Sequence, residues 1–215
     1  MPEQETTAQK AVMFDPAQPI EVRLNTAAGI KSMSVRFPKN DEWIERAKKR
    51  RIVTTQLGRG RSVTQVADSD EIDLGFFHQL AVDKSDIEID GTEATRIIEM
   101  LGAATAIDIA ESGNMFVITL LVVGGRKTIH NLTIPSTPDI DRFRRAYVRQ
   151  LELPANKREL RVNLDAAAQL YKNLSEGTEG YVGGSTIPIT HQAAALLAAI
   201  EKLESLLEVE PEENF

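Results

Sequence analysis

An internal repeat constrains the fold of this chain more than any single motif does. Residues 22–50 and residues 117–149 follow the same order: an alternating strand, a proline, a short polar stretch and a basic amphipathic helix. Pro38 ends the strand of the first copy, and Pro135, 97 residues later, ends that of the second. Proline ends a strand because it cannot donate a ladder hydrogen bond. A repeated supersecondary unit is typical of a chain that packs and assembles.

The hydrophobic periodicity predicts an α+β protein made of two related β-hairpin/meander-plus-helix units with a helical C-terminus. The first unit spans residues 12–89 and holds hairpins at 20–37 and 52–66, each followed by a helix. The second spans residues 90–210 and holds a helix, a three-stranded meander over 106–134 and the C-terminal helices. Residues 1–11 and 211–215 are expected to be flexible termini.

Start signals locate several helices. Asn40 is a candidate N-cap, and Asp90 followed three residues later by Glu93 predicts a capping box. Thr137 is expected to cap a helix that has proline at its first position. This helix is expected to continue through residue 151, because a buried stripe at helical spacing is formed by Ile140, Phe143, Tyr147 and Leu151. Residues 177–184 are rich in glycine and predict a loop.

Composition narrows the classes of function. The 215 residues are 42% hydrophobic and 27% charged, as in globular proteins. A net charge of −7 and a pI near 5.1 disfavour a dedicated nucleic-acid binder. The chain has no cysteine, which excludes disulfides and thiolate metal sites. The longest apolar run, residues 115–123, is less than half the roughly 20 residues of a membrane helix, and no apolar leader is visible; we expect a soluble protein that binds no membrane.

No catalytic, cofactor-binding or metal-binding residue is predicted, and no cofactor is expected. The glycines at 124–125 precede a strand rather than a helix, so they predict a hairpin turn and not a phosphate-binding loop. His78, His130 and His191 lack metal-ligand spacing and are interpreted as surface or boundary residues. A catalytic site assembled from distant residues such as Asp68, Asp70 and His130 is the least favoured hypothesis, because no motif supports it.

Two basic clusters and one apolar stripe form the candidate interaction face. Its members are Arg46, Lys49, Arg50, Arg142, Arg145, Leu196, Ile200, Leu203 and Leu207. The basic residues indicate either a solvated helix face, a protein interface or, as the alternative function, a nucleotide- or nucleic-acid-binding regulatory module that uses the face around residues 46–51. The four leucine and isoleucine residues near the C-terminus have heptad spacing, which predicts either packing on the meander or a homo-oligomer through this helix.

The segment TIHNLTIPSTPDID at residues 128–141 resembles bacteriophage and prophage tail assembly proteins. It is similar in particular to tail assembly chaperones, which run from a β-hairpin through a turn with proline and threonine into a set of helices. The resemblance implies a non-enzymatic assembly factor, or a structural component of a phage-like particle, that binds other protein subunits such as tail-tube or tape-measure proteins. It also implies a location in the cytoplasm of a bacterial host cell, with association with the virion as a further expectation.

Overall fold

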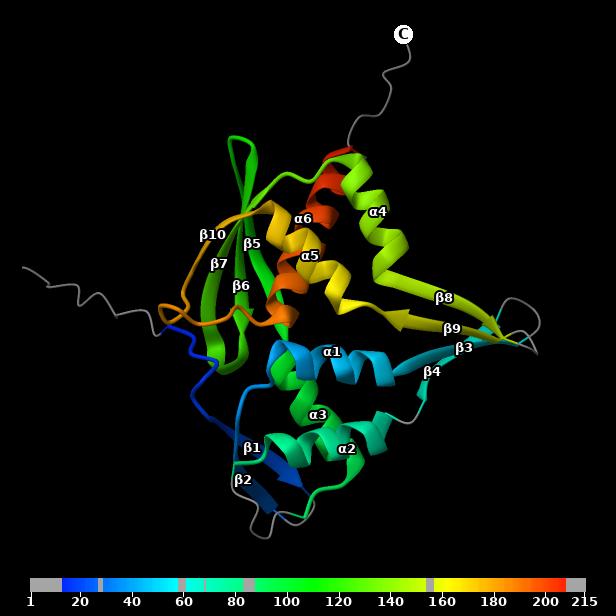
Figure 1. Cartoon of the computed structure of the whole chain (residues 1–215). Helices are drawn as coiled ribbons and strands as arrows, with labels where there is room; N and C mark the ends of the chain where they lie inside the picture. Colours follow the sequence, from blue (N-terminus) through cyan, green and yellow to red (C-terminus); the bar gives the residue numbers. More distant parts are fainter. Residues whose placement is uncertain are drawn as a thin grey trace, which may run out of the picture.

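The computed structural model describes residues 13–26, 29–57, 61–67, 69–82, 88–153 and 157–207. These residues form six α-helices and three antiparallel sheets, which confirms the α+β class (Figure 1). The expected flexible termini, residues 1–11 and 211–215, lie outside the described residues. Residues 208–210, at the C-terminal end of the second unit, also lie outside them.

The first half of the chain forms two hairpins and three helices. Its elements are β1 (Ile20–Thr26), β2 (Gly29–Val35), α1 (Asn40–Lys49), β3 (Arg51–Leu57), β4 (Arg61–Ala67), α2 (Ser69–Leu80) and α3 (Gly91–Gly102). The second half begins with the meander and ends with the longest helix. Its elements are β5 (Ala104–Ser112), β6 (Met115–Val122), β7 (Arg126–Thr133), α4 (Thr137–Tyr147), β8 (Val148–Leu153), β9 (Lys157–Val162), α5 (Leu164–Leu174), β10 (Ser175–Glu179) and α6 (Ile189–Leu207).

The two halves repeat the same order of elements at a nearly constant spacing. The spacing of 97 residues that separates the two prolines also relates β2 to β7, α1 to α4 and β3 to β8. A shorter second hairpin reduces it to 94 residues, so that α2 corresponds to α5. The strand contact after this helix is also repeated: Ala81 pairs with Val35 in the first half, and Ser175 pairs with Leu132 in the second. The repeat therefore extends well beyond the segments in which the sequence displays it.

Three hydrophobic clusters hold the molecule together. In the first, the sheet ordered β10-β7-β6-β5 packs against α6, and β6 alternates buried and less buried residues with Phe116, Ile118 and Leu120 inside. The second lies between the β1-β2 hairpin and the pair α2 and α3. The third joins α4, α5 and α6. Burying each large apolar side chain contributes about 1.5–3 kcal/mol, so these clusters supply most of the driving force for folding.

Helix α3, which the sequence placed at the start of the second unit, from residue 90 onward, packs on α2 of the first half. Ile97, Ile98 and Leu101 of α3 are buried in the second cluster, against Phe77 and Leu80 of α2. In the second half α6 packs on α5 in the same way. The clusters also cross the boundary, because Phe37 lies in the first cluster and Ile189 in the second.

The second hairpin of the repeat corrects one helix prediction. Helix α4 ends at Tyr147, and the chain continues as β8 instead of extending the helical stripe to residue 151. Strand β8 pairs with β9 from Val148↔Val162 to Leu153↔Lys157. Strand β10 also replaces the start of the predicted loop, because residues 175–179 pair with β7.

Two predicted helix caps are shifted, and one is confirmed. Ser136 rather than Thr137 is the N-cap of α4, and Lys39 precedes α1 in place of Asn40. Asn40 serves another helix: its Nδ2 donates to the carbonyl of Ile187 (3.1 Å), and its Oδ1 accepts from the N–H of Ile189 (2.8 Å) at the start of α6. Asp90 forms the predicted capping box of α3, in which its Oδ1 accepts from the Glu93 N–H at 2.8 Å.

Candidate functional site

The second hairpins of the two halves join into one four-stranded sheet, which we call the hairpin sheet. Its order is β4-β3-β9-β8, and all neighbours are antiparallel. Val and Thr, which favour strands, occupy six positions of β3 and β4, whereas β8 and β9 hold one Val each. Figure 1 shows these strands extending away from the helices, beyond the ends of α1 and α4. None of the described residues in these four strands belongs to the three hydrophobic clusters.

The two outer strands of the hairpin sheet each have one neighbour among the described residues. On β4, the side chains of Ser62, Val63, Thr64 and Gln65 are all exposed. On β8, Val148, Arg149 and Gln150 are exposed. An edge strand presents unpaired backbone N–H and C=O groups, which can pair with a strand of another chain.

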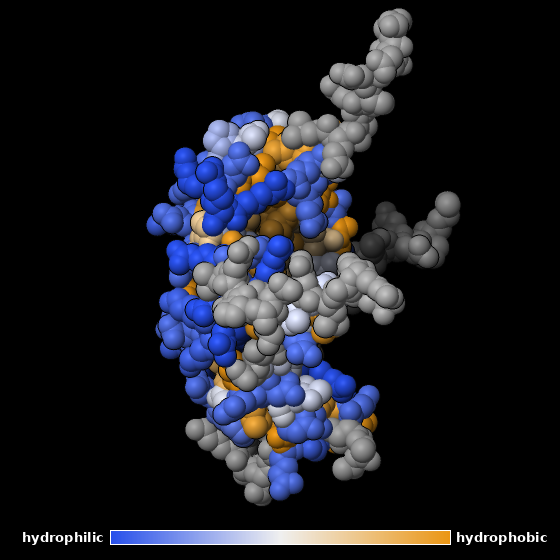
Figure 2. Space-filling view, turned by 90° about the vertical axis from the view of Figure 1, so that its right-hand side faces the viewer, coloured by the Kyte–Doolittle hydropathy of each residue, from blue (hydrophilic) through white to orange (hydrophobic). Residues whose placement is uncertain are grey.

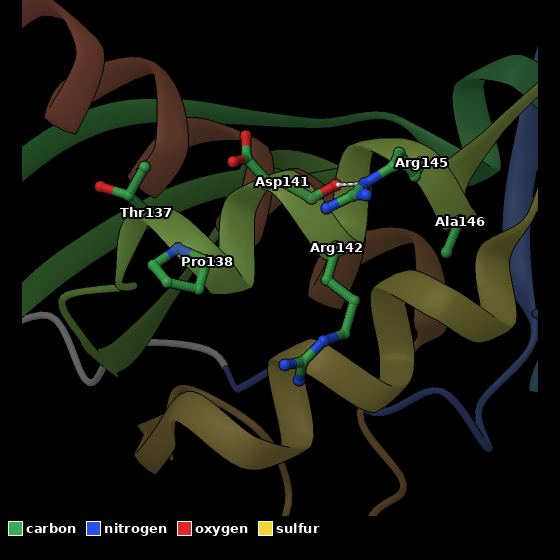
Figure 3. A pocket seen from close by; sticks show the side chains of 6 residues that line it. All are labelled: Thr137, Pro138, Asp141, Arg142, Arg145 and Ala146. Atoms are coloured by element: carbon green, nitrogen blue, oxygen red, sulfur yellow. Dashed lines mark hydrogen bonds between the residues drawn. The ribbon is translucent and has the colours of Figure 1, made fainter.

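The face from which the hairpin sheet extends is mostly hydrophilic. Figure 2 shows apolar residues at the bottom of a hollow in the upper half of this face. On α4, an open depression is lined by Thr137, Pro138, Asp141, Arg142, Arg145 and Ala146 (Figure 3). Arg145 donates from Nε to the carbonyl of Asp141 at 3.1 Å, and the Arg142 side chain is 80% exposed. The predicted residues Arg142 and Arg145 therefore lie on a surface that a partner can reach.

The first basic cluster does not form one open face. The Arg46 side chain is 9% exposed and makes a bidentate ion pair with fully buried Asp73 of α2, with N–O distances of 2.6 and 2.9 Å. Its guanidinium also lies 5.5 Å from the centre of the Trp43 ring. Arg50 lies 3.7 Å from Glu99, whereas Lys49 is exposed. Arg46 is thus part of the interior, and its inclusion in an interaction face is wrong.

The apolar stripe of α6 is also mostly internal. Leu196 and Ile200 are buried in the third cluster, and Leu203 is partly buried against the first and third clusters. The side chain of Leu207 lies outside the described part of the structure. The helix packs on the meander and on α5, which was one of the two expected outcomes. Leu196 and Ile200 are therefore not available for a homo-oligomer through this helix.

Two histidines that the sequence placed at the surface or boundary lie in the core. His130 on β7 and His191 in the first turn of α6 are fully buried, whereas His78 is exposed. His130 Nδ1 lies 2.6 Å from the hydroxyl of Tyr171, and its Nε2 lies 3.1 Å from the hydroxyl of Tyr181. The Tyr181 hydroxyl also lies 3.0 Å from His191 Nδ1, so one polar chain joins β7, α5 and α6.

Burial keeps the groups of this polar chain uncharged. Desolvation lowers the pKa of His130 to about 4. Desolvation, and then the neighbouring His130, lower the pKa of His191 to about 3. Burial raises the pKa of the Tyr171 hydroxyl to about 12. Both imidazoles are therefore neutral at pH 7, and because neither has solvent-accessible surface, a substrate cannot reach them for proton transfer.

Comparison of the two halves explains why sequence analysis missed this chain of polar groups. At the repeat spacing, His130 and Tyr171 correspond to Met33 and Phe77, which are buried in the apolar second cluster. Two patterns signal that His130 is internal: it shares one face of β7 with Leu132, and the corresponding positions of the first half point to the core. The ion pair shows the opposite exchange: Arg46 and Asp73 correspond to Phe143 and Ala167, and both of these are buried in the third cluster.

The two aspartates of the least favoured hypothesis, a catalytic site of Asp68, Asp70 and His130, do not form a site with His130 among the described residues. Asp70 is exposed on α2, where it accepts from Thr92 of α3 at 3.4 Å, and Asp68 lies outside the described residues. No group of three metal-ligating side chains occurs among the residues that the structure describes. Within the same residues, no helix has the length and apolar character that crossing a bilayer requires.

Comparison of the chain with protein-family models, with curated protein sequences and with solved structures finds no match. The function is therefore argued from the geometry described above.

Proposed function

We propose that this protein is a non-enzymatic subunit that binds other proteins during the assembly of a phage-like particle, as an assembly factor of the tail-chaperone kind or as a structural component. The hairpin sheet is the observation that supports this proposal most strongly. The side chains of this sheet that the structure describes lie outside the three hydrophobic clusters, and both of its outer edges carry exposed side chains. A sheet that does not help to bury the core of its own chain is suited to pairing with another chain.

The resemblance of residues 128–141 to tail assembly proteins directs the choice of partners toward tail-tube and tape-measure proteins. The interior supports a binding role over catalysis, because the buried histidines are neutral and inaccessible and their polar partners are Thr128 and tyrosines. The alternative function, binding of nucleotides or nucleic acid around residues 46–51, has less support. Arg46 is held by Asp73, and Arg50 lies beside Glu99, so neither is poised for phosphate.

Co-expression with the tail-tube and tape-measure proteins of the same particle tests the proposal. We expect one of them to co-purify with the wild-type chain and to be lost from the Val63→Lys variant, because a lysine on an edge strand opposes pairing. Met100→Lys is the matched control: Met100 on α3 is 38% exposed and Val63 is 42% exposed, but only Val63 lies on the hairpin sheet. Absence of both proteins from the wild-type complex, or equal loss in both variants, would contradict the proposed function.

A further inference from the structure

The two hairpins contact each other through two non-equivalent strands, and we call this contact the joint. It pairs β3, the first strand of the first hairpin, with β9, the second strand of the second hairpin. At the repeat spacing, β3 corresponds to β8 and β4 corresponds to β9. The joint therefore places the first strand of one repeat against the second strand of the other, and the two contacting surfaces are different.

The same two kinds of strand form the outer edges of the sheet. At one edge lies β8, which is a first strand, and at the other lies β4, which is a second strand. Neighbouring strands alternate in direction across the order β4-β3-β9-β8, so a β4 strand from another copy placed beside β8 would again be antiparallel. Among the described residues, each chain thus carries one internal copy of the joint and, at the two outer edges of the sheet, the two strands that correspond to its halves.

We propose that copies of this protein associate head to tail, with β8 of one copy pairing with β4 of the next and extending the hairpin sheet by four strands per copy. The proposal rests on the proposed function, because it gives the hairpin sheet a second partner, another copy of this chain, beside the tail proteins. The two surfaces differ, so the contact cannot be completed in a two-fold dimer and continues into a ring or a filament.

The internal joint also sets the register of the proposed contact. Inside the chain, β3 and β9 pair from Ile52↔Leu160 to Thr55↔Lys157. The two hairpin registers relate β3 to β8 by 97 residues and β4 to β9 by 95 residues. Applied to the joint, these shifts place the following residues opposite each other between copies: Arg149 and Gln65, Gln150 and Thr64, Leu151 and Val63, and Glu152 and Ser62.

The composition of the edges agrees with this contact. Charged residues and proline commonly protect an edge strand from pairing; β4 has no proline, and its one charged residue is Arg61 at its first position, outside the four proposed pairs. The register places Arg149 and Glu152 opposite uncharged residues, so no like charges face each other. The register also places exposed Val63 opposite another apolar position of the sequence, residue 151.

Cysteine cross-linking tests the contact with little background, because the chain has no cysteine. Thr64→Cys and Gln150→Cys are made in separate chains, mixed and oxidised. Within one chain these positions lie on opposite edges of the sheet, about 14 Å apart for three strand spacings. A disulfide requires Cα atoms within about 7 Å, so it can form only between copies. We expect a covalent dimer from the mixture, little from either variant alone, and a ladder of larger species when both cysteines are in one chain.

Three controls make the cross-linking result decisive. A second mixture of Val63→Cys with Leu151→Cys tests the neighbouring pair, because consecutive antiparallel pairs alternate in geometry. A mixture of Val63→Cys with Gln150→Cys is out of register by one residue and should react less. Thr54→Cys with Arg158→Cys in one chain reports the internal joint and shows that oxidation is complete. The fluorescence of Trp43, the single tryptophan, confirms that each variant is folded.

The proposal is overturned if neither in-register mixture gives a covalent dimer when the internal control is fully oxidised. It is also overturned if Thr64→Cys alone dimerises as well as the mixture, because that result indicates a two-fold contact of β4 with itself. These outcomes do not decide the proposed function. A chain that does not cross-link but still retains a tail protein through the hairpin sheet supports the proposed function and contradicts only the contact between copies. Loss of tail-protein binding with intact cross-linking contradicts the proposed function alone.

Discussion

The two buried histidines predict a steep loss of stability in mild acid. In the unfolded chain a histidine titrates near 6.5, whereas in the folded protein the pKa is about 4 for His130 and about 3 for His191. Between these values the unfolded state binds more protons, so stability falls as the pH decreases below 6.5. Each histidine costs about 1.4 kcal/mol per pH unit in this range, or about 2 kcal/mol at pH 5. Both folded pKa values lie well below 5, so the expected loss of stability at pH 5 is nearly the same for the two histidines.

The first half of the chain provides the variant that isolates one histidine. His130→Met combined with Tyr171→Phe copies the apolar pair Met33 and Phe77 from the equivalent positions. Urea unfolding of wild type and variant is followed by Trp43 fluorescence at pH 7.5 and pH 5. We expect the wild type to lose about 2 kcal/mol more than the variant between these two pH values, because carboxylates contribute equally to both proteins.

The predicted quantity is the change in the free energy of unfolding between the two pH values, measured separately for each protein. His78→Gln, which removes an exposed histidine from α2, is the control for the loss of one imidazole. If the wild type and the His130→Met, Tyr171→Phe variant lose the same free energy of unfolding between pH 7.5 and pH 5, His130 is not held neutral by burial, and the reasoning from the core is refuted.

Three further predictions use the same urea assay. Asp73→Ala leaves the Arg46 charge buried without a partner and should cost about 3–5 kcal/mol, whereas adding Arg46→Phe should recover most of the loss. Gly180→Ala should cost more than Gly184→Ala: both have positive φ, a penalty of about 1–2 kcal/mol, but only the Cβ at 180 would lie 2.5 Å from a backbone oxygen. Asn40→Ala removes two hydrogen bonds to the start of α6 and should cost about 1–2 kcal/mol; an unchanged midpoint would contradict this link between the halves.

Local signals in the sequence were sufficient for elements whose pattern agrees with their packing. The alternation in β6, the capping box at Asp90 and the glycines at the meander turn each predict the structure that is found. In these places the residues that form the element also bury its apolar face, so local preference and tertiary contacts act in the same direction.

The prediction failed where pairing with another strand, rather than the residue pattern of the segment itself, determines its structure. Leu151 continues the helical spacing of Ile140, Phe143 and Tyr147, and its strand becomes evident only through pairing with β9. The spacing of 97 residues would have placed a hairpin there, because it relates the Thr- and Val-rich β3 to β8. Strand β10 pairs with β7 although its sequence SEGTE has few strand-forming residues, so its partner rather than its propensity determines its structure.

Burial of charged and polar residues was predicted least well, because it depends on pairs of residues from separate helices and strands. Arg46 resembles its exposed basic neighbours on α1, and nothing local indicates that Asp73 lies opposite it on α2. The second half has Phe143 and Ala167 at the same two positions, so each half fills this space with a compatible pair. The reverse exchange occurs at His130 and Tyr171, a polar pair of the second half that stands where the first half has the apolar pair Met33 and Phe77.

These paired exchanges separate two kinds of contact in the repeat. Where a contact lies within one half, as between α1 and α2, both partners can change together and the chemistry of the pair has diverged. The contact that joins the two halves is formed by the two hairpins, and these have similar lengths: seven residues per strand in the first and six in the second. Both hairpins also keep the antiparallel order of the sheet. A strand-to-strand joint depends mainly on backbone hydrogen bonds, so it tolerates changes of sequence on either edge that do not introduce a lysine or a proline. The hairpin sheet is therefore the part of each half in which the same joint can form again with another copy, even though the cores that support it no longer match.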